Sequence, residues 1–197
     1  MTSASTRIVA GIAALATAVV VSSCSKTEDH STHAASTTTT TSEQVAAHNA
    51  HDVMFAQMMI PHHQQAVDLT ALVPDRSTNP AVVKLAATIS GEQQPEITAM
   101  KALLVQWDVG PDASADQSDM MMAGMVDDAT MAKLKTLKGA DFDTLWLQSM
   151  ISHHQGAIEM AGGEVAGGQN VDMTKMAENM VTAQQAEIDQ MKQMLGG

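Results

Sequence analysis

The chain has 197 residues, of which 22 are acidic and 10 are basic, so its formal net charge is −12. It contains 17 methionines but only two tryptophans, two phenylalanines and no tyrosine. A nucleic-acid-binding protein needs a basic surface and aromatic stacking platforms, and this composition argues against that class. The length suits a single domain, or two small repeats that share one core.

The first 23 residues have the pattern of a secretory signal peptide. Arg7 precedes an apolar run, residues 8–21, that is too short to span a membrane. The run ends in Val21-Ser22-Ser23-Cys24, which resembles a bacterial lipoprotein cleavage box. We therefore expect Cys24 to be lipidated and to anchor the protein to the cell membrane on its outer side. A secreted protein with an unpaired cysteine is the alternative.

Residues 24–47 are polar and of low complexity, and they include the run from Thr37 to Thr41. Such a composition is typical of a flexible tether. We expect a folded domain over residues 48–197 that this tether holds away from the membrane.

The remaining chain contains an internal repeat with an offset of 91 residues. This offset aligns Met59-Ile-Pro-His62-His63-Gln64 with Met150-Ile-Ser-His153-His154-Gln155, and Gln93-Gln94-Pro-Glu96-Ile97 with Gln184-Gln185-Ala-Glu187-Ile188. Two separate blocks that share one offset indicate a duplicated helical hairpin. We place the two copies at about residues 51–104 and 142–195.

Helical periodicity runs through both copies. In the first helix, one face carries residues at alternating steps of four and three, namely Phe55, Met59, His62, Ala66 and Leu69. Trp146, Met150, His153, Ala157 and Met160 repeat that face in the third helix. Four amphipathic helices with short hairpin turns and one longer connector predict an all-α, ferritin-like four-helix bundle.

Local signals place the helix ends. Asn79-Pro80 is expected to begin the second helix, and the fourth should begin near Asn170. Pro61 and Pro95 interrupt the first two helices, and each should kink its helix or divide it into two segments. Within the connector, residues 108–140, a short helix is expected from about Asp128 to Lys138, where the following glycine stops it.

The paired histidines carry the chemistry. Met59 lies three residues before His62 and four before His63, and both spacings bring side chains together on a helix. The second copy repeats this cluster with Met150, His153 and His154. Thioether sulfur prefers Cu(I), and imidazole binds Cu(I), Cu(II) and zinc. The spacing predicts a copper site, mainly for Cu(I) and also for Cu(II), with silver as a mimic. The fold should not require the metal.

A packing role is the alternative for these residues, because methionine often fills cores and a buried histidine is often paired with an acid. Glu96 and Glu187 lie on inner helix faces and could be those acids, as could Gln93 and Gln184 as polar neighbours. Counting back from the first hairpin turn places Gln93 about one turn from His62 and Glu96 about two turns away. We therefore expect Gln93 to be within reach of His62 and Glu96 to be too distant for a direct ligand.

The connector contains a second group of methionines, Met120, Met121, Met122 and Met125, among aspartates. One helical face cannot bury all four. The group is either a mobile loop that captures soft metal ions or a methionine-rich lid packed on the bundle.

The repeated Met-Ile-x-His-His-Gln motif, the Gln-x-x-Glu-Ile-x-x-Met motif and Phe142-Asp143 resemble the bacterial domain of unknown function family 305 over about residues 48–195. This resemblance implies a ferritin-like bundle, and some members of the family are periplasmic copper-binding proteins linked to copper resistance. It also implies metal-binding roles for the two Met-His-His clusters and for Met122 and Met125. His48, His51, Met54 and Met58 extend the pattern towards the amino terminus without counterparts in the second copy.

The sequence leaves three functions open. The first is a membrane-anchored lipoprotein that binds copper for buffering, resistance or delivery, without catalysis. The second is a ferritin-like metal oxidase, although the di-iron pattern Glu-x-x-His is absent, because Met59, Ile60, Met150 and Ile151 stand three residues before the histidines. The third is a structural lipoprotein whose acidic surface docks a basic partner.

Overall fold

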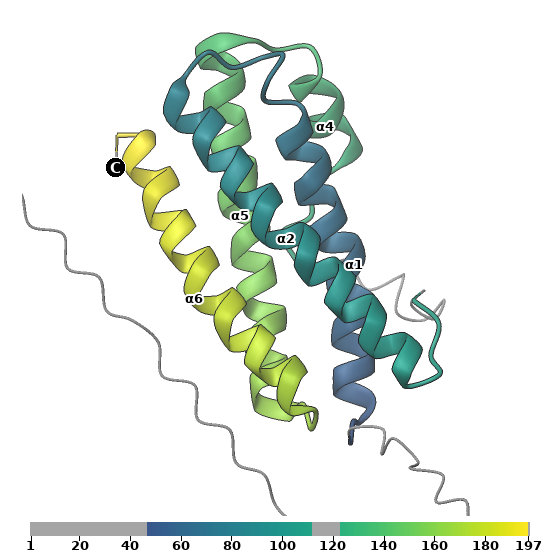
Figure 1. The fold of residues 1–197 in the computed structure, drawn as a ribbon. Helices are drawn as coiled ribbons and strands as arrows, with labels where there is room; N and C mark the ends of the chain where they lie inside the picture. Colours follow the sequence, from purple (N-terminus) through teal and green to yellow (C-terminus); the bar gives the residue numbers. More distant parts are fainter. Residues whose placement is uncertain (1–46, 112–122, 197) are drawn as a thin grey trace, which may run out of the picture. The chain divides into compact units, whose positions relative to one another are not determined.

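Four long helices and one short helix make up the described part of the chain (Figure 1). The computed structural model describes residues 47–111 and 123–196. The helices are α1 (Ala50–Ala71), α2 (Pro80–Gln106), α4 (Asp128–Leu134), α5 (Gly139–Gly167) and α6 (Val171–Met194). Neither described range contains a strand. The prediction of an all-α four-helix bundle is confirmed.

Several predicted features lie outside the described residues. They are the signal peptide (residues 1–23), Cys24, the tether as far as residue 46, and Met120, Met121 and Met122. Within the described ranges, no helix combines the length and the apolar character that a membrane span requires.

Asparagine caps fix where three of the four long helices begin. The Asn49 side chain accepts hydrogen bonds from the backbone N–H groups of His51 and Asp52, and the Asp52 carboxylate accepts one from the Asn49 N–H in return. Asn79 and Asn170 cap α2 and α6 with their side chains, at the positions that the sequence predicts. The starts of α1, α2 and α6 are therefore encoded locally, whereas Lys138 at the start of α5 forms no side-chain cap.

Of the two alternatives at the prolines, division of the helix is excluded and the kink stays a prediction, while the expected end of the short helix is corrected. α1 and α2 each continue through their proline as one helix, so neither is divided at Pro61 or Pro95. The short helix α4 ends at Leu134, not at Lys138, and Gly139 does not stop it. Gly139 instead begins α5 with a φ of 59°, and its N–H donates to the Arg76 carbonyl at 2.7 Å. Glycine tolerates this left-handed conformation, which turns the chain from α4 into α5.

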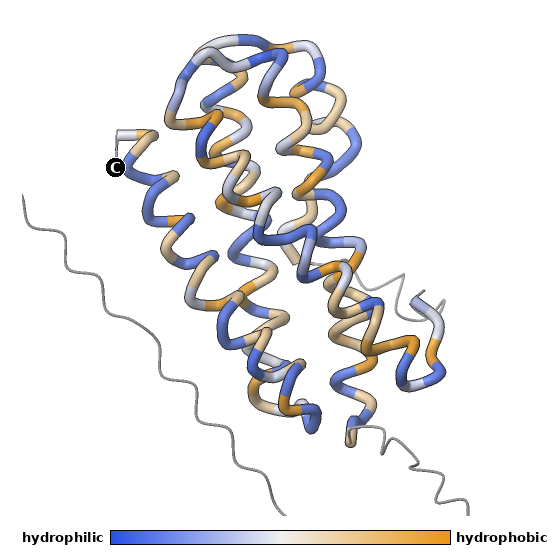
Figure 2. The backbone as a smooth tube through the Cα atoms, in the orientation of Figure 1, coloured by the Kyte–Doolittle hydropathy of each residue, from blue (hydrophilic) through white to orange (hydrophobic). Residues whose placement is uncertain are grey.

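The two hairpins meet mainly through α1 and α5, while α2 packs on α1 and α6 packs on α5 (Figure 1). Hydrophilic and hydrophobic residues alternate along the helices, as Figure 2 shows. The buried apolar side chains form two clusters. One lies around Leu69 and Trp146, whose Nε1–H donates to the Leu69 carbonyl at 3.0 Å, and the other lies around Phe55 and Met100.

Polar residues separate these two clusters on every long helix. On α1, His62 and His63 lie between Ile60 of one cluster and Ala66 of the other. α2, α5 and α6 repeat this division at Gln93, at the second histidine pair and at Gln184. The core is thus interrupted midway along the bundle by one polar layer.

Candidate metal centre

We call this interruption the histidine layer. It comprises His62 and His63 from α1, Gln93 and Glu96 from α2, His153 and His154 from α5, and Gln184 and Glu187 from α6. All four histidines are fully buried. Burial of a polar group costs free energy unless a partner compensates, so the partners of these side chains decide what the layer can do.

His62 and His153 are in contact across the interface between α1 and α5. Their ring centroids lie 3.7 Å apart and the rings are tilted by 35°. Burial, reinforced by the neighbouring His63, lowers the pKa of His62 to about 3, although its hydrogen bond to Ala123 acts in the opposite direction. Burial and the charges of His62, His154 and His63 hold the pKa of His153 well below its ordinary value. Both rings are therefore neutral at neutral pH, which is the form that binds metal ions.

The outer two histidines are each paired with a glutamate. His63 Nε2 lies 2.8 Å from Glu96 Oε2, and His154 Nε2 lies 2.7 Å from Glu187 Oε2. The alternative in which Glu96 and Glu187 are the acid partners of buried histidines is confirmed for these contacts, and the expectation that Glu96 is not a direct metal ligand stays a prediction. His62 faces α5, whereas the adjacent His63 faces α2 and reaches Glu96.

A hydrogen-bond acceptor faces the Nε2 atom of three of the four rings. The Ala123 carbonyl, 3.1 Å from His62 Nε2, can only accept a hydrogen bond, so that nitrogen carries the proton. The carboxylates of Glu96 and Glu187 act in the same way on His63 and His154.

The Nδ1 atoms of these three rings form no hydrogen bond within residues 47–111 and 123–196. Neither nitrogen of His153 has a partner in good hydrogen-bonding geometry in this part of the chain, although the nearby His62 backbone acts to raise its pKa against the larger effect of burial. The amide of Gln93, which was expected to be the neighbour of His62, has no partner there either. Buried ring nitrogens without a hydrogen-bond partner are suited to a bound ion. The same ranges contain no ready group of three His, Cys, Asp or Glu side chains around one metal position.

Met59 and Met150 border the histidine layer from opposite sides. Both are fully buried, and each lies one helical turn before a histidine of the central pair. Met59 belongs to the apolar cluster around Phe55, and Met150 belongs to the cluster around Trp146. The layer is therefore flanked by one thioether from each hairpin.

The end of the connector crosses this layer. Gln65 forms two hydrogen bonds with the Val126 backbone, each 2.8 Å long. A Cβ on Gly156 would lie 1.8 Å from the Ala123 carbonyl oxygen, so only glycine permits this approach to α5. The sequence analysis did not single out Gln65 or Gly156. The offset of 91 residues aligns these two positions, and a glutamine aligned with a glycine in otherwise similar copies is a signal that would have found them.

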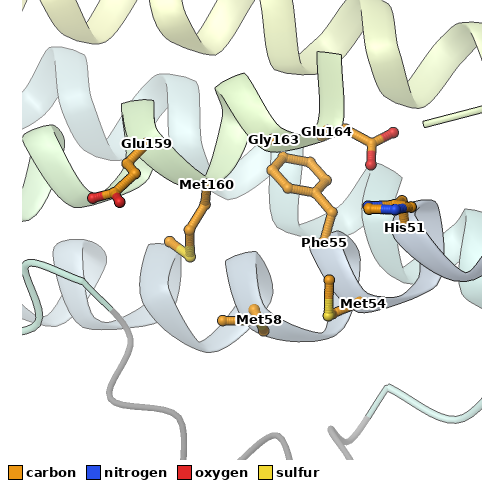
Figure 3. Close-up of a pocket in the computed structure, with 8 residues that line it drawn as sticks. All are labelled: His51, Met54, Phe55, Met58, Glu159, Met160, Gly163 and Glu164. Atoms are coloured by element: carbon orange, nitrogen blue, oxygen red, sulfur yellow. The ribbon is translucent and has the colours of Figure 1, made fainter. Parts of the chain in front are cut away.

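The other predicted ligands lie in separate places. Met125 is half-buried and lines a pocket of about 180 Å³ with Ser149 and Ser152, apart from the central histidine pair. The His48 ring stacks on Trp107, with centroids 4.5 Å apart and planes 9° from parallel. His51, Met54 and Met58 line a pocket between α1 and α5 (Figure 3).

Three solved structures are similar to this chain in fold and sequence. A DUF305 protein from Streptomyces coelicolor, described as secreted, is 35% identical with a TM-score of 0.70, over 74% of this chain and 92% of that chain. A DUF305 fragment from Deinococcus radiodurans is 33% identical with a TM-score of 0.67, over 75% of this chain and 97% of the fragment. CopM in its Cu(I)-bound form is 32% identical with a TM-score of 0.61, over 72% of this chain and 93% of CopM.

CopM has also been solved with Cu(II) and with silver. Among curated proteins, none matches the chain. The sequence model of the domain of unknown function DUF305 matches residues 52–195, which is most of the chain. The protein therefore belongs to the DUF305 family.

Proposed function

We propose that this protein is an extracytoplasmic lipoprotein that binds copper, mainly Cu(I), for buffering, resistance or delivery. The observation that carries the proposal is the contact between the neutral rings of His62 and His153, where a buried nitrogen of His153 has no partner in good hydrogen-bonding geometry in the described part of the chain. The copper-bound and silver-bound structures of CopM, a relative with a third of its residues identical, support the choice of metal.

The proposed ligands are the six residues of the two Met-His-His clusters. Met59 and Met150 offer thioethers, and the four histidines offer imidazoles in a site without exposed surface. This combination favours Cu(I), which binds soft sulfur and imidazole readily. Glu96 and Glu187 would act behind the metal, because a carboxylate on one ring nitrogen orients the ring and makes its other nitrogen more basic.

The connector gives a route by which methionine could approach this site. Its end contacts the layer through the Ala123 carbonyl. Met125 lies two residues beyond that contact, and Met122, outside the described residues, directly precedes it. We include both as accessory copper ligands in the proposal.

Competition for Cu(I) under anaerobic conditions tests the central site. The double variant Met59→Leu and Met150→Leu preserves side-chain volume while removing both sulfurs, so its fold should be retained. We expect its affinity for Cu(I) to fall at least tenfold. The matched control is Met100→Leu with Met180→Leu, two equally buried core methionines, and it should bind as the parent does. Equal affinity in all three proteins would contradict the central site.

Two further measurements address the rest of the proposal. A ligand that binds only the folded state raises its melting temperature, so silver should stabilise the parent. A melting temperature indifferent to silver would favour the purely structural function.

Replacement of Cys24 by serine should release the protein from the membrane fraction, whereas an unchanged distribution would argue against the lipid anchor.

A further inference from the structure

A pocket on the side of the bundle gathers a second set of soft ligands. It has a volume of about 260 Å³ and lies between the amino-terminal half of α1 and the carboxy-terminal half of α5 (Figure 3). α1 contributes His51, Met54 and Met58, whose spacings of three and four residues place them on one helix face. α5 contributes Met160, which points towards α1 in Figure 3.

We propose that this pocket is a second soft-metal site, in which the thioethers of Met54, Met58 and Met160 and the imidazole of His51 take Cu(I) or Ag(I). It shares no residue with the histidine layer, so either site can exist without the other. Met160 was expected only as part of the apolar stripe of its helix. The packing of α5 against α1 brings it to the pocket.

The exposure of these methionines distinguishes them from packing residues. Met59, Met100 and Met150 are fully buried in the apolar clusters. The three pocket methionines are only half-buried, and His51 is exposed. A metal ion can therefore reach the pocket ligands from solvent without opening the bundle.

The charge of the pocket also favours a cation. The Glu159 carboxylate lines it, and neither lysine nor arginine does. Glu164 is buried and interacts with Asp52, so we assign it no role as a ligand. Phe55 is an apolar wall of the pocket, and with three thioethers beside it the site selects a soft ion over a strongly hydrated one.

Silver titration of the full-length chain, labelled with ¹³C at the methionine methyl groups, tests the site directly. Single leucine variants assign the methyl signals of Met54, Met58 and Met160. We expect all three signals to shift with the first equivalents of Ag(I) and to stay unchanged with Zn(II). Absence of a silver-induced shift in these signals would overturn the proposal, whether or not the variants fold.

Native mass spectrometry of the same chain then counts the bound silver ions. The triple variant Met54→Leu, Met58→Leu and Met160→Leu should bind one ion fewer than the parent. The control replaces Met131, Met176 and Met194, which are also half-buried but lie elsewhere, and it should bind the parental number. An equal count in the pocket variant and the parent, or an equal loss in both triple variants, would contradict the site.

The histidine-layer variant Met59→Leu with Met150→Leu separates this proposal from the proposed function. If the layer variant loses an ion while the pocket signals still shift, both sites exist. If the layer variant keeps the parental count and the pocket signals shift, the pocket stands and the central site fails. If only the layer variant loses an ion and the pocket signals do not move, the pocket proposal fails alone.

Discussion

Gln65 and Gly156 occupy equivalent positions of the two hairpins, and both hold the same piece of connector against the histidine pair. Gln65 does so with its side-chain amide, which bonds both backbone groups of Val126. Gly156 has no side chain, and this leaves room for the backbone of Ala123 and Gly124 to approach its Cα. The two copies thus differ at the position where one connector must contact both of them.

Gly156→Ala should displace the connector. The added Cβ would lie 1.8 Å from a backbone oxygen, which cannot move aside as a flexible side chain could. We expect the free energy of unfolding to fall by about 1–3 kcal/mol, as for other overpacked sites, and exchange of the Val126 amide hydrogen to accelerate. Urea unfolding and hydrogen exchange measure these two effects.

Gly162→Ala is the matched control for this substitution. It lies on the same helix, and a Cβ there meets no atom within 4 Å. Because alanine favours helix more than glycine does, this variant should gain up to about 1 kcal/mol in stability. Similar stability changes in the two variants would show that the connector does not depend on Gly156.

The central histidines predict a loss of stability in acid. Burial lowers the pKa of His62 to about 3, with His63 adding to the effect, and the pKa of His153 is lowered in the same direction. Below the ordinary value of 6.5 the unfolded chain binds protons that the folded chain does not. The free energy of unfolding should therefore fall by about 1.4 kcal/mol per pH unit for His62 as the pH falls from 6.5 towards 3, and His153 should add to this fall in the same direction.

Urea unfolding at several pH values measures this slope. The double variant His62→Gln and His153→Gln should show a smaller fall than the parent across the same range, because glutamine does not titrate. Parallel pH profiles for the two proteins would mean that these rings are already charged in the folded state.

The sequence was sufficient for the existence of the four long helices and for their inner faces, although not for the end of α4. Asn79 and Asn170 mark helix starts by local hydrogen bonding, and the steps of three and four identify buried positions such as Met59 and His153. These features depend on residues within one or two turns of each other. They are accessible without knowledge of the tertiary structure.

Contacts between side chains of different helices could not be predicted in this way. Adjacent residues of a helix diverge by about 100°, so whether His62 or His63 faces α2 depends on how the hairpins pack. The pairing of His63 with Glu96 follows from that packing. Met160 likewise meets the pocket only because the end of α5 lies against the start of α1. Both outcomes result from long-range contacts that periodicity does not specify.

The carboxylates of the histidine layer should tune metal affinity without being ligands. Replacement of Glu187 by leucine removes the hydrogen bond to His154 Nε2, which is 2.7 Å long in the structure. On the proposed function, Cu(I) affinity should fall by about 10- to 100-fold, as is typical when such a partner is lost. Glu187→Gln retains an oxygen acceptor and should lose less, which anaerobic competition can measure. A leucine variant with parental affinity would show that His154 does not bind the metal.

The buried carboxyl groups of Asp52 and Glu164, near the carboxy terminus of α5, predict that stability falls as the pH rises. This trend is opposite to that of the central histidines. Burial, with a hydrogen bond to Asp52 and the charge of Asp52, raises the pKa of Glu164 to about 8. Asp52 keeps its charge because backbone N–H groups of Asn49, Asn170 and Gln169 donate to it and lower its pKa, although burial alone would raise it. Between about pH 4.5 and pH 8 the folded chain therefore binds a proton that the unfolded chain has released.

It follows that the contribution of Glu164 to stability is lost as the pH rises through this window. Glu164→Gln donates to Asp52 at every pH, so its stability relative to the parent should increase between about pH 5 and pH 8. Thermal unfolding at matched ionic strength measures the difference, with the exposed Glu159→Gln as the control. If the parent and Glu164→Gln lose stability equally over this range, Glu164 is not the proton carrier, and the pair must be held by the backbone donors to Asp52 alone.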